Sequence, residues 1–215
     1  MKNENVFDRI APGWYNFRHW TIFRAELEAL AQRWQQGRLL NIGCGHGPDF
    51  LPFKDGFELY GIDSSAEMLK YARKYSVKHG FAVNLAQADA RHLPYPDNTF
   101  DWAIAVATYH HLRNKEERQA ALQELKRVLK PGGVAFITVW NRRQPRFTFF
   151  RREAMVPWRT GDETIYRYYY LFTYRELERL VREAGLTILR SFPESSYHLP
   201  VKYFSKNICL VVGKV

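Results

Sequence analysis

The chain has 215 residues, 46% of them hydrophobic, which is enough for one buried core but not for two domains of ordinary size. Its net charge of +10 excludes an acidic protein and favours a polyanionic partner, such as nucleic acid or an acidic small molecule. It has no CxxC pair, no apolar leader and no apolar run near the roughly 18 residues of a membrane span, so we expect a cytoplasmic protein without membrane segment or metal.

Short apolar runs alternate with amphipathic segments along the chain, which is typical of an α/β sheet with helices on its faces. We expect an N-terminal helical cap over 1–36, with a helix over 20–35, and further helices over 65–78, 115–130 and 173–184. The predicted strands cover 38–43, 57–63, 81–87, 100–108, 133–140, 186–192 and 207–215. No helix separates the last two strands, so they can pair antiparallel.

The glycine-rich stretch NIGCGHG, residues 41–47, follows the first predicted strand. Gly43 and Gly45 allow a tight turn and let a ligand approach the backbone closely. Asp63 ends the second predicted strand, where a carboxylate can accept hydrogen bonds from ribose hydroxyls. Because Gly47 comes one residue too early for the pyrophosphate pattern GxGxxG, the motif favours a nucleoside ligand without a pyrophosphate. The alternative is a glycine cluster that only forms a turn.

These motifs, together with GIDSSAEMLKYA, AQADARHLPYPDNTFDWAI and LKRVLKPGG, resemble those of the seven-stranded, Rossmann-like methyltransferases that use S-adenosylmethionine. The resemblance covers nearly the whole chain and implies one methyltransferase domain over 1–215. It implies an α/β sheet of order 3-2-1-4-5-7-6 with helices on both faces, the last strand pair being antiparallel. S-adenosylmethionine is then the cofactor and S-adenosylhomocysteine the product.

The same resemblance implies a set of cofactor-binding residues. Gly43 and Gly45 lie against the methionine part, Asp63 holds the ribose, Met68 packs on adenine, and Asp89 with Ala90 addresses the adenine edge. The full implied set is Asn41, Gly43, Cys44, Gly45, Asp63, Ser64, Met68, Asp89, Ala90 and Val106. Most relatives have an aspartate where this chain has Asn41. Asp89 as an ordinary loop carboxylate and Met68 as a core residue are the alternatives.

A narrower resemblance rests on VATYHHL after strand four, on Val139 and Trp140 ending strand five, and on YRYYYLFTYRELERLV. These segments look like the tRNA wobble-uridine carboxymethyl methyltransferases, which esterify 5-carboxymethyluridine in the anticodon. The matching positions are His110, His111, Trp140, Arg167, Tyr168, Tyr169 and Phe172. The implied catalytic residues are Arg18, His110 and His111. Arg18 clamps either the substrate carboxylate or the carboxylate of S-adenosylmethionine. The alternative for the histidines is one helix cap and one solvated side chain.

A basic, aromatic insertion is expected over 141–172, beginning NRRQPRFTFFRREAMVPWRT with six arginines. Its arginines would contact RNA phosphates, and Phe147, Phe149, Phe150 and Trp158 would offer faces for an unstacked base. The alternative is a solvated basic loop above buried aromatic rings. The family resemblance also implies a partner besides the tRNA anticodon region, a small zinc-binding activator subunit that pairs with the edge strand over 81–87.

The expected chemistry needs no general base, because a carboxylate nucleophile is already ionised near pH 7. Two other functions remain open at this point. A small-molecule methyltransferase would turn over without RNA. A non-catalytic RNA module that binds S-adenosylmethionine, suggested by Asn41 and by the lack of an evident base, would bind the cofactor without methyl transfer.

Overall fold

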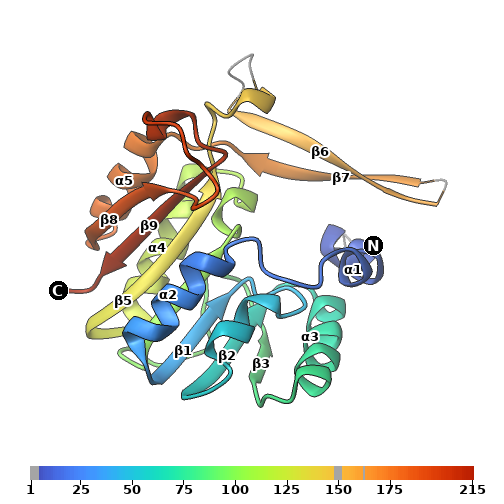
Figure 1. Cartoon of the computed structure of the whole chain (residues 1–215), viewed down its shortest axis with the longest axis horizontal. Coiled ribbons are helices and arrows are strands. Elements are labelled where there is room, and N and C mark those ends of the chain that lie inside the picture. The colour runs from blue at the N-terminus through green and yellow to red at the C-terminus, as the bar shows by residue number, and fades with distance from the viewer. Residues whose placement is uncertain (1–4, 148–151, 162) are drawn as a thin grey trace.

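A computed structural model describes residues 5–147, 152–161 and 163–215 (Figure 1). Its α-helices are α1 (Val6–Phe17), α2 (Arg24–Trp34), α3 (Ala66–His79), α4 (Lys115–Val128) and α5 (Tyr174–Glu183). Its strands are β1 (Gly37–Ile42), β2 (Phe57–Asp63), β3 (Asn84–Gln87), β4 (Phe100–Val106), β5 (Leu129–Trp140), β6 (Glu153–Thr160), β7 (Glu163–Tyr170), β8 (Thr187–Pro193) and β9 (Asn207–Gly213). Short 3-10 turns include η1 (Pro48–Phe53) and η2 (Tyr109–His111).

Seven strands form one sheet in the order β3-β2-β1-β4-β5-β9-β8. The neighbouring pairs from β3 to β5 are parallel, whereas β9 lies antiparallel to both β5 and β8. Counting only the strands of this sheet, the order is 3-2-1-4-5-7-6 with an antiparallel last pair. The predicted fold class is therefore confirmed. The described part of the chain contains no helix long and apolar enough to cross a membrane.

Each strand sends alternate side chains to two apolar cores, one on each face of the sheet. Leu40 and Ile42 of β1 pack into the core that α4 and α5 cover. Leu39 of the same strand packs into the other core, with α2, η1 and Leu69 of α3. In Figure 1, α2 lies on the viewer's side of the sheet and α4 behind it. Burial on both faces explains why the central strands are continuous apolar runs.

Three sequence predictions need correction. The N-terminal cap contains two helices, of which α1 is additional and α2 begins four residues later than predicted. Strand β3 covers only 84–87, because Phe81 and Val83 lie before it and pack against the core that α2 covers. Within the insertion expected over 141–172, for which no secondary structure was predicted, β6 and β7 pair as an antiparallel hairpin.

We call the hairpin formed by β6 and β7 the arm. It extends away from the main sheet and passes over α1 (Figure 1). Phe149 and Phe150, two of the predicted base-stacking residues, lie outside the described residues. Trp158, a third, does not stand free, because its ring packs against Trp14 at 5.2 Å and Phe17 at 5.6 Å between ring centroids.

Candidate active site

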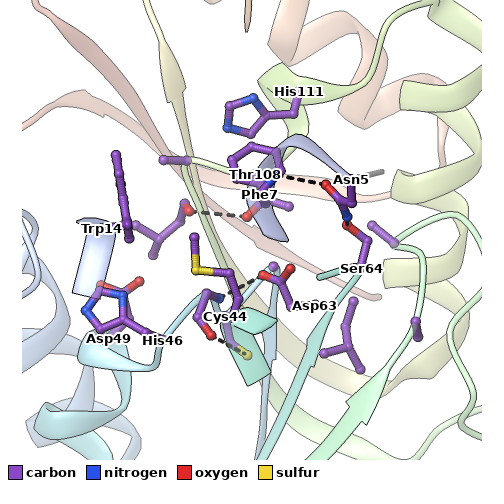
Figure 2. A pocket seen from close by; sticks show the side chains of 18 of the residues that line it. Asn5, Phe7, Trp14, Cys44, His46, Asp49, Asp63, Ser64, Thr108 and His111 are labelled. Carbon is purple, nitrogen blue, oxygen red and sulfur yellow. Dashed lines mark hydrogen bonds between the residues drawn. The ribbon is translucent and has the colours of Figure 1, made fainter. Parts of the chain in front are cut away.

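A cavity of about 280 Å³ lies where the carboxyl ends of β1 to β4 meet, the edge at which parallel α/β sheets bind ligands. The segments after these strands form its floor and walls, and α1 forms its roof. Figure 2 shows Asp63 and Cys44 on one side of this space, with Phe7 and His111 on another. Of the predicted cofactor residues, nine line the cavity: Gly43, Cys44, Gly45, Asp63, Ser64, Met68, Asp89, Ala90 and Val106.

The loop after β1 depends on glycine at one position for a steric reason. Gly43 has φ +70°, and a Cβ placed there would lie 2.5 Å from two side-chain atoms of Thr108. Thr108 itself is held because its Oγ1 donates to the carbonyl of Ile42 at 2.8 Å. Gly45 also has a positive φ, of 54°, but open space faces it. The backbone at Gly45 is therefore accessible to a ligand, as the motif predicts.

Asp63 links the glycine loop to the start of α3. Its two carboxylate oxygens accept hydrogen bonds from the N–H groups of Gly45, at 2.8 Å, and Ser65, at 2.9 Å. Burial raises the pKa of Asp63 to about 6, and these hydrogen bonds only partly oppose that effect. Each carboxylate oxygen has a second lone pair, so Asp63 can still accept hydrogen bonds from a ligand in the cavity.

Helix α1 closes the cavity from above and is fastened to α3. Asp8 accepts hydrogen bonds from Ser65 Oγ at 2.6 Å and from the N–H of Glu67 at 3.1 Å, at the positive N-terminal end of α3. Asn5 donates to Ser64 Oγ at 3.0 Å (Figure 2). These residues at the start of α1 were not predicted from the sequence as part of the site. The available signal was Asn5, a favourable N-cap residue whose side chain accepts from Phe7 N.

The end of the cavity expected to hold adenine is lined by Met68, Asp89, Ala90 and Val106. The Met68 side chain is buried and also packs against Ile10 of α1. The Asp89 carboxylate accepts two hydrogen bonds from the Arg91 guanidinium, at 2.9 and 2.6 Å, and one from the Arg91 N–H at 2.8 Å, and these lower its pKa. Asp89 is therefore ionised and held in place at neutral pH.

The opposite end of the cavity carries one positive and one negative side chain. Arg18, from the segment after α1, lines the wall, and its guanidinium carbon lies 4.9 Å from the centroid of the Trp14 ring. Asp49 lines the same end, and burial raises its pKa to about 6 although Thr21 and Arg18 oppose the shift. His46 accepts no proton here at neutral pH, because burial lowers its pKa to about 4.

The two adjacent histidines have different environments. His111 lines the cavity, where its ring lies edge-on to Phe7 at 4.8 Å. Its Nδ1 donates to the carbonyl of Tyr168 at 2.9 Å, which leaves Nε2 as a hydrogen-bond acceptor. Burial lowers the pKa of His111 to about 4, so the ring is neutral at pH 7. It can accept a hydrogen bond from a substrate but cannot pair with an anion as a cation.

His110 and Asn41 are predicted site residues that do not line the cavity. His110 is fully buried, and its Nδ1 accepts from the N–H of Trp140 at 3.1 Å. Its ring packs against Tyr169 at 4.8 Å, so it supports the aromatic wall next to His111. Asn41 is fully buried in β1, and neither polar atom of its amide has a hydrogen-bond partner among the described residues.

Arg167 of β7 is a buried cation beside this site. Its residue is 6% exposed, and its guanidinium carbon lies 5.1 Å from the ring centroid of Trp14 and 5.5 Å from that of Trp158. One terminal nitrogen donates to Tyr169 Oη at 3.0 Å, whereas Nε has no partner. Burial and the neighbouring charge of Arg18 lower its pKa. Within the described chain, neither Arg18 nor Arg167 forms an ion pair with a carboxylate.

Comparison with known proteins agrees with this architecture. The family model described as a methyltransferase domain matches residues 40–137. A methyltransferase from Encephalitozoon cuniculi is 31% identical over 180 residues, which cover 80% of each chain. The tRNA (carboxymethyluridine(34)-5-O)-methyltransferase of Schizosaccharomyces pombe is 28% identical over 212 residues, which cover 86% of this chain and 88% of that protein.

Solved structures share the fold. In the complex between the Haloferax volcanii Trm112 methyltransferase activator and a methyltransferase, one chain matches this one with a TM-score of 0.67 and 18% identity, over 97% of both chains. The chain has the glycine loop, the carboxylate at the end of β2 and the strand order expected of a methyltransferase. It also has a methyltransferase relative that is 31% identical over 80% of each chain. The chain therefore belongs to the family of S-adenosylmethionine-dependent methyltransferases.

Proposed function

We propose that this methyltransferase transfers a methyl group to the carboxylate of 5-carboxymethyluridine at the wobble position of a tRNA anticodon. The observation that carries the proposal is the pair Arg18 and Arg167. Arg18 lines the cavity, Arg167 lies beside it, and both guanidinium groups are partly desolvated. Neither forms an ion pair with a carboxylate of the described chain, although the charge of Asp49 acts on Arg18 and opposes the effect of burial on its pKa. Buried positive charge of this kind favours an anionic ligand.

The relatives and the charge distribution support an RNA substrate. The Schizosaccharomyces pombe relative is named for methyl transfer to carboxymethyluridine 34 of tRNA. In this chain, the interval 141–170 holds seven arginines and three acidic residues, a large share of the net charge of +10. Positive charge concentrated near an active site attracts a polyanion. An enzyme of this kind would act on tRNA in the cytoplasm.

The residues around the cavity suit the cofactor of this family. Gly45, which faces open space, leaves room for its methionine part, and Gly43 keeps the loop close to Thr108. Asp63 accepts from its ribose hydroxyls, and Met68 with Val106 packs against its adenine. S-adenosylmethionine supplies an electrophilic methyl group on a sulfonium. In the proposed reaction Arg18 orients the substrate carboxylate, and the neutral His111 accepts a hydrogen bond from the uridine through Nε2. No proton has to be removed from the carboxylate at pH 7.

The proposal is tested with labelled S-adenosylmethionine and two tRNA samples, one with 5-carboxymethyluridine at the wobble position and one with the neutral 5-carbamoylmethyluridine. Nucleoside mass spectrometry should detect the methyl ester in the first sample only. Transfer to an acidic small molecule without RNA would favour the small-molecule alternative. Cofactor binding without any transfer would favour the non-catalytic RNA module.

We expect cofactor affinity to depend on pH through Asp63. Its pKa is raised to about 6, and the ribose hydroxyls need the ionised carboxylate as acceptor, so affinity should fall by up to about tenfold per pH unit below pH 6. Calorimetric titration between pH 5 and 8 measures this. Asp49 has a pKa of about 6 in the same cavity, so Asp49→Asn is the control. If the cofactor affinity of Asp49→Asn does not change with pH, the pH dependence of the wild type belongs to Asp49 and not to Asp63.

We also propose that a small zinc-binding activator subunit pairs with the free edge of β3. The complex from Haloferax volcanii contains a methyltransferase activator. Strand β3 ends the sheet, pairs within the described residues with β2 alone, and contains no proline to block a further strand. Helix α3 contacts β3, and Val77 near the end of α3 is 82% exposed. A partner covering this edge would bury that side chain.

Val77→Glu should therefore reduce recovery of the co-expressed activator in a tagged pull-down, because a carboxylate would be buried without a partner. Val215→Glu is the matched control, since Val215 is 96% exposed at the C-terminus. If Val77→Glu recovers as much activator as the control, the partner does not cover this edge. Methyl transfer by the isolated chain at full rate would remove the need for an activator.

A further inference from the structure

The two faces of the arm have opposite roles. Val156, Trp158, Ile165, Arg167 and Tyr169 alternate along β6 and β7 and share one face. This inner face packs on α1 and on the wall of the cavity, as Trp158 on Trp14 and Tyr169 on His111 illustrate. The side chains of the inner face are therefore packed against the rest of the protein and are not free to bind RNA bases. The predicted role of Trp158 in base stacking does not fit this position.

The outer face of the arm is defined here as Met155, Pro157, Arg159, Tyr166 and Tyr168. Its side chains are exposed except that of Tyr168, which is half-buried at the base of the arm. Met155 is 54% exposed and Tyr166 is 56% exposed. Met155 lies directly opposite Tyr168, and Pro157 opposite Tyr166, so the four side chains form one continuous patch. A two-stranded ribbon with such a face is a recognisable docking surface.

Cations surround this patch. Arg159 lies at its outer end and is exposed. At its inner end Arg113 stacks over the Tyr168 ring, 5.0 Å from the ring centroid, and Tyr168 Oη donates to the carbonyl of Arg113 at 3.2 Å. The Tyr166 ring, by contrast, contacts no other ring or cation within the described chain. The patch thus offers a free aromatic face between two guanidinium groups.

We propose that the outer face of the arm binds unpaired RNA bases next to the reactive nucleotide, with Tyr166 as the main stacking residue and Tyr168 as the second. This inference rests on the proposed function and adds the surface that holds the RNA loop. Splayed bases of single-stranded RNA stack on aromatic side chains presented by a sheet and on arginine planes. Tyr166 and Tyr168 are two residues apart on one strand, roughly 6.6 Å by strand geometry, which lets each take a separate base.

Charge selects RNA over a protein partner for this surface. The interval 141–170, to which the arm belongs, has a net charge of +4 from seven arginines and three acidic residues. Of the acidic residues in the described strands, Glu163 is paired with Arg9 on the inner side. Glu153 lies at the base of the arm, where its carboxylate contacts Tyr168 and, after burial, helps to raise the pKa of that residue. The exposed Tyr166 ring lies between Arg159 and Arg113, which suits bases on a phosphate backbone.

The test compares Tyr166→Ala and Tyr166→Phe with the wild type, using a fluorescent anticodon stem-loop that contains 5-carboxymethyluridine and a saturating amount of S-adenosylhomocysteine. Tyr166→Ala should weaken binding by about 5- to 100-fold, and Tyr166→Phe should bind like the wild type because the ring is kept. Leu189→Ala, which truncates an exposed apolar side chain on β8, is the control.

Salt dependence separates stacking from charge. Tyr166→Ala should leave the slope of log affinity against log salt unchanged, whereas Arg159→Gln should reduce it by about 1. If Tyr166→Ala binds the stem-loop like Leu189→Ala, the surface does not hold RNA bases. If Tyr166→Ala instead loses a protein partner or changes the oligomeric state, the surface is a protein interface. Failure of the wild type to methylate any tRNA would refute the proposed function itself.

Discussion

Replacing Asp63 by alanine is expected to abolish measurable binding of S-adenosylmethionine. The carboxylate would lose charged hydrogen bonds to two ribose hydroxyls, which together contribute about 3 kcal/mol or more, a loss of at least roughly 100-fold in affinity. The same change leaves the N–H groups of Gly45 and Ser65 without their acceptor, so the glycine loop loses part of its fixed shape. Isothermal calorimetry measures the affinity.

Two variants make this experiment specific. Asp63→Asn keeps the shape and one acceptor oxygen but not the charge, so it should bind more tightly than alanine and more weakly than aspartate. Glu58→Ala removes a carboxylate from the other end of the same strand, where it contacts Arg38, and should leave affinity unchanged. Circular dichroism checks that each variant is folded. Wild-type affinity in folded Asp63→Ala would exclude Asp63 from the site.

Arg18→Ala is expected to reduce methyl transfer by about 10- to 100-fold while cofactor affinity changes little, because a charged hydrogen bond to the substrate carboxylate would be lost. The rate of methyl transfer is measured in single turnovers with saturating cofactor, and cofactor affinity is measured by calorimetry. Both values are compared between the variant and the wild type. Arg24→Ala is a suitable control, since Arg24 is an exposed residue near Arg18 in the chain and pairs with Glu28 on the surface.

The opposite result has a clear meaning. If Arg18→Ala loses cofactor affinity first, Arg18 holds the carboxylate of S-adenosylmethionine, and Arg167 remains as the cation near the substrate. His111→Ala should likewise lower transfer more than cofactor binding, because its Nε2 is a free acceptor in the cavity. Full turnover of His111→Ala on the modified tRNA would rule out its role in orienting the uridine.

The sequence predicted the main sheet well because burial on two faces leaves a strong pattern. Strand β1, which ends at Ile42, has apolar side chains on both faces of the sheet. Helix α3 is bounded by the capping residue Ser65 and by Gly80. The arm was missed because its alternation includes Arg167 and Pro157, which look like residues of a solvated loop. Gly161 between two alternating runs, with φ +54°, was the available hairpin signal.

The site was predicted in part for a related reason. Asp63 and the glycines lie at fixed distances from strand ends, so spacing alone brings them together. Asn5 and Asp8, at the start of α1, bond to Ser64 and Ser65, which lie more than 50 residues further along the chain. No local sequence pattern predicts contacts of this kind. Arg167 is similar, because its burial between Trp14 and Trp158 depends on how the arm packs on α1.

The two arginines without carboxylate partners also bear on turnover. In the proposed reaction the substrate arrives as an anion and leaves as a neutral methyl ester. The attraction from Arg18 and Arg167 therefore acts on the substrate and disappears with the product, while both cations repel each other again once the anion is gone. Product inhibition by the esterified tRNA should accordingly be weak, because the charge of the pocket attracts the anionic substrate and not the neutral ester.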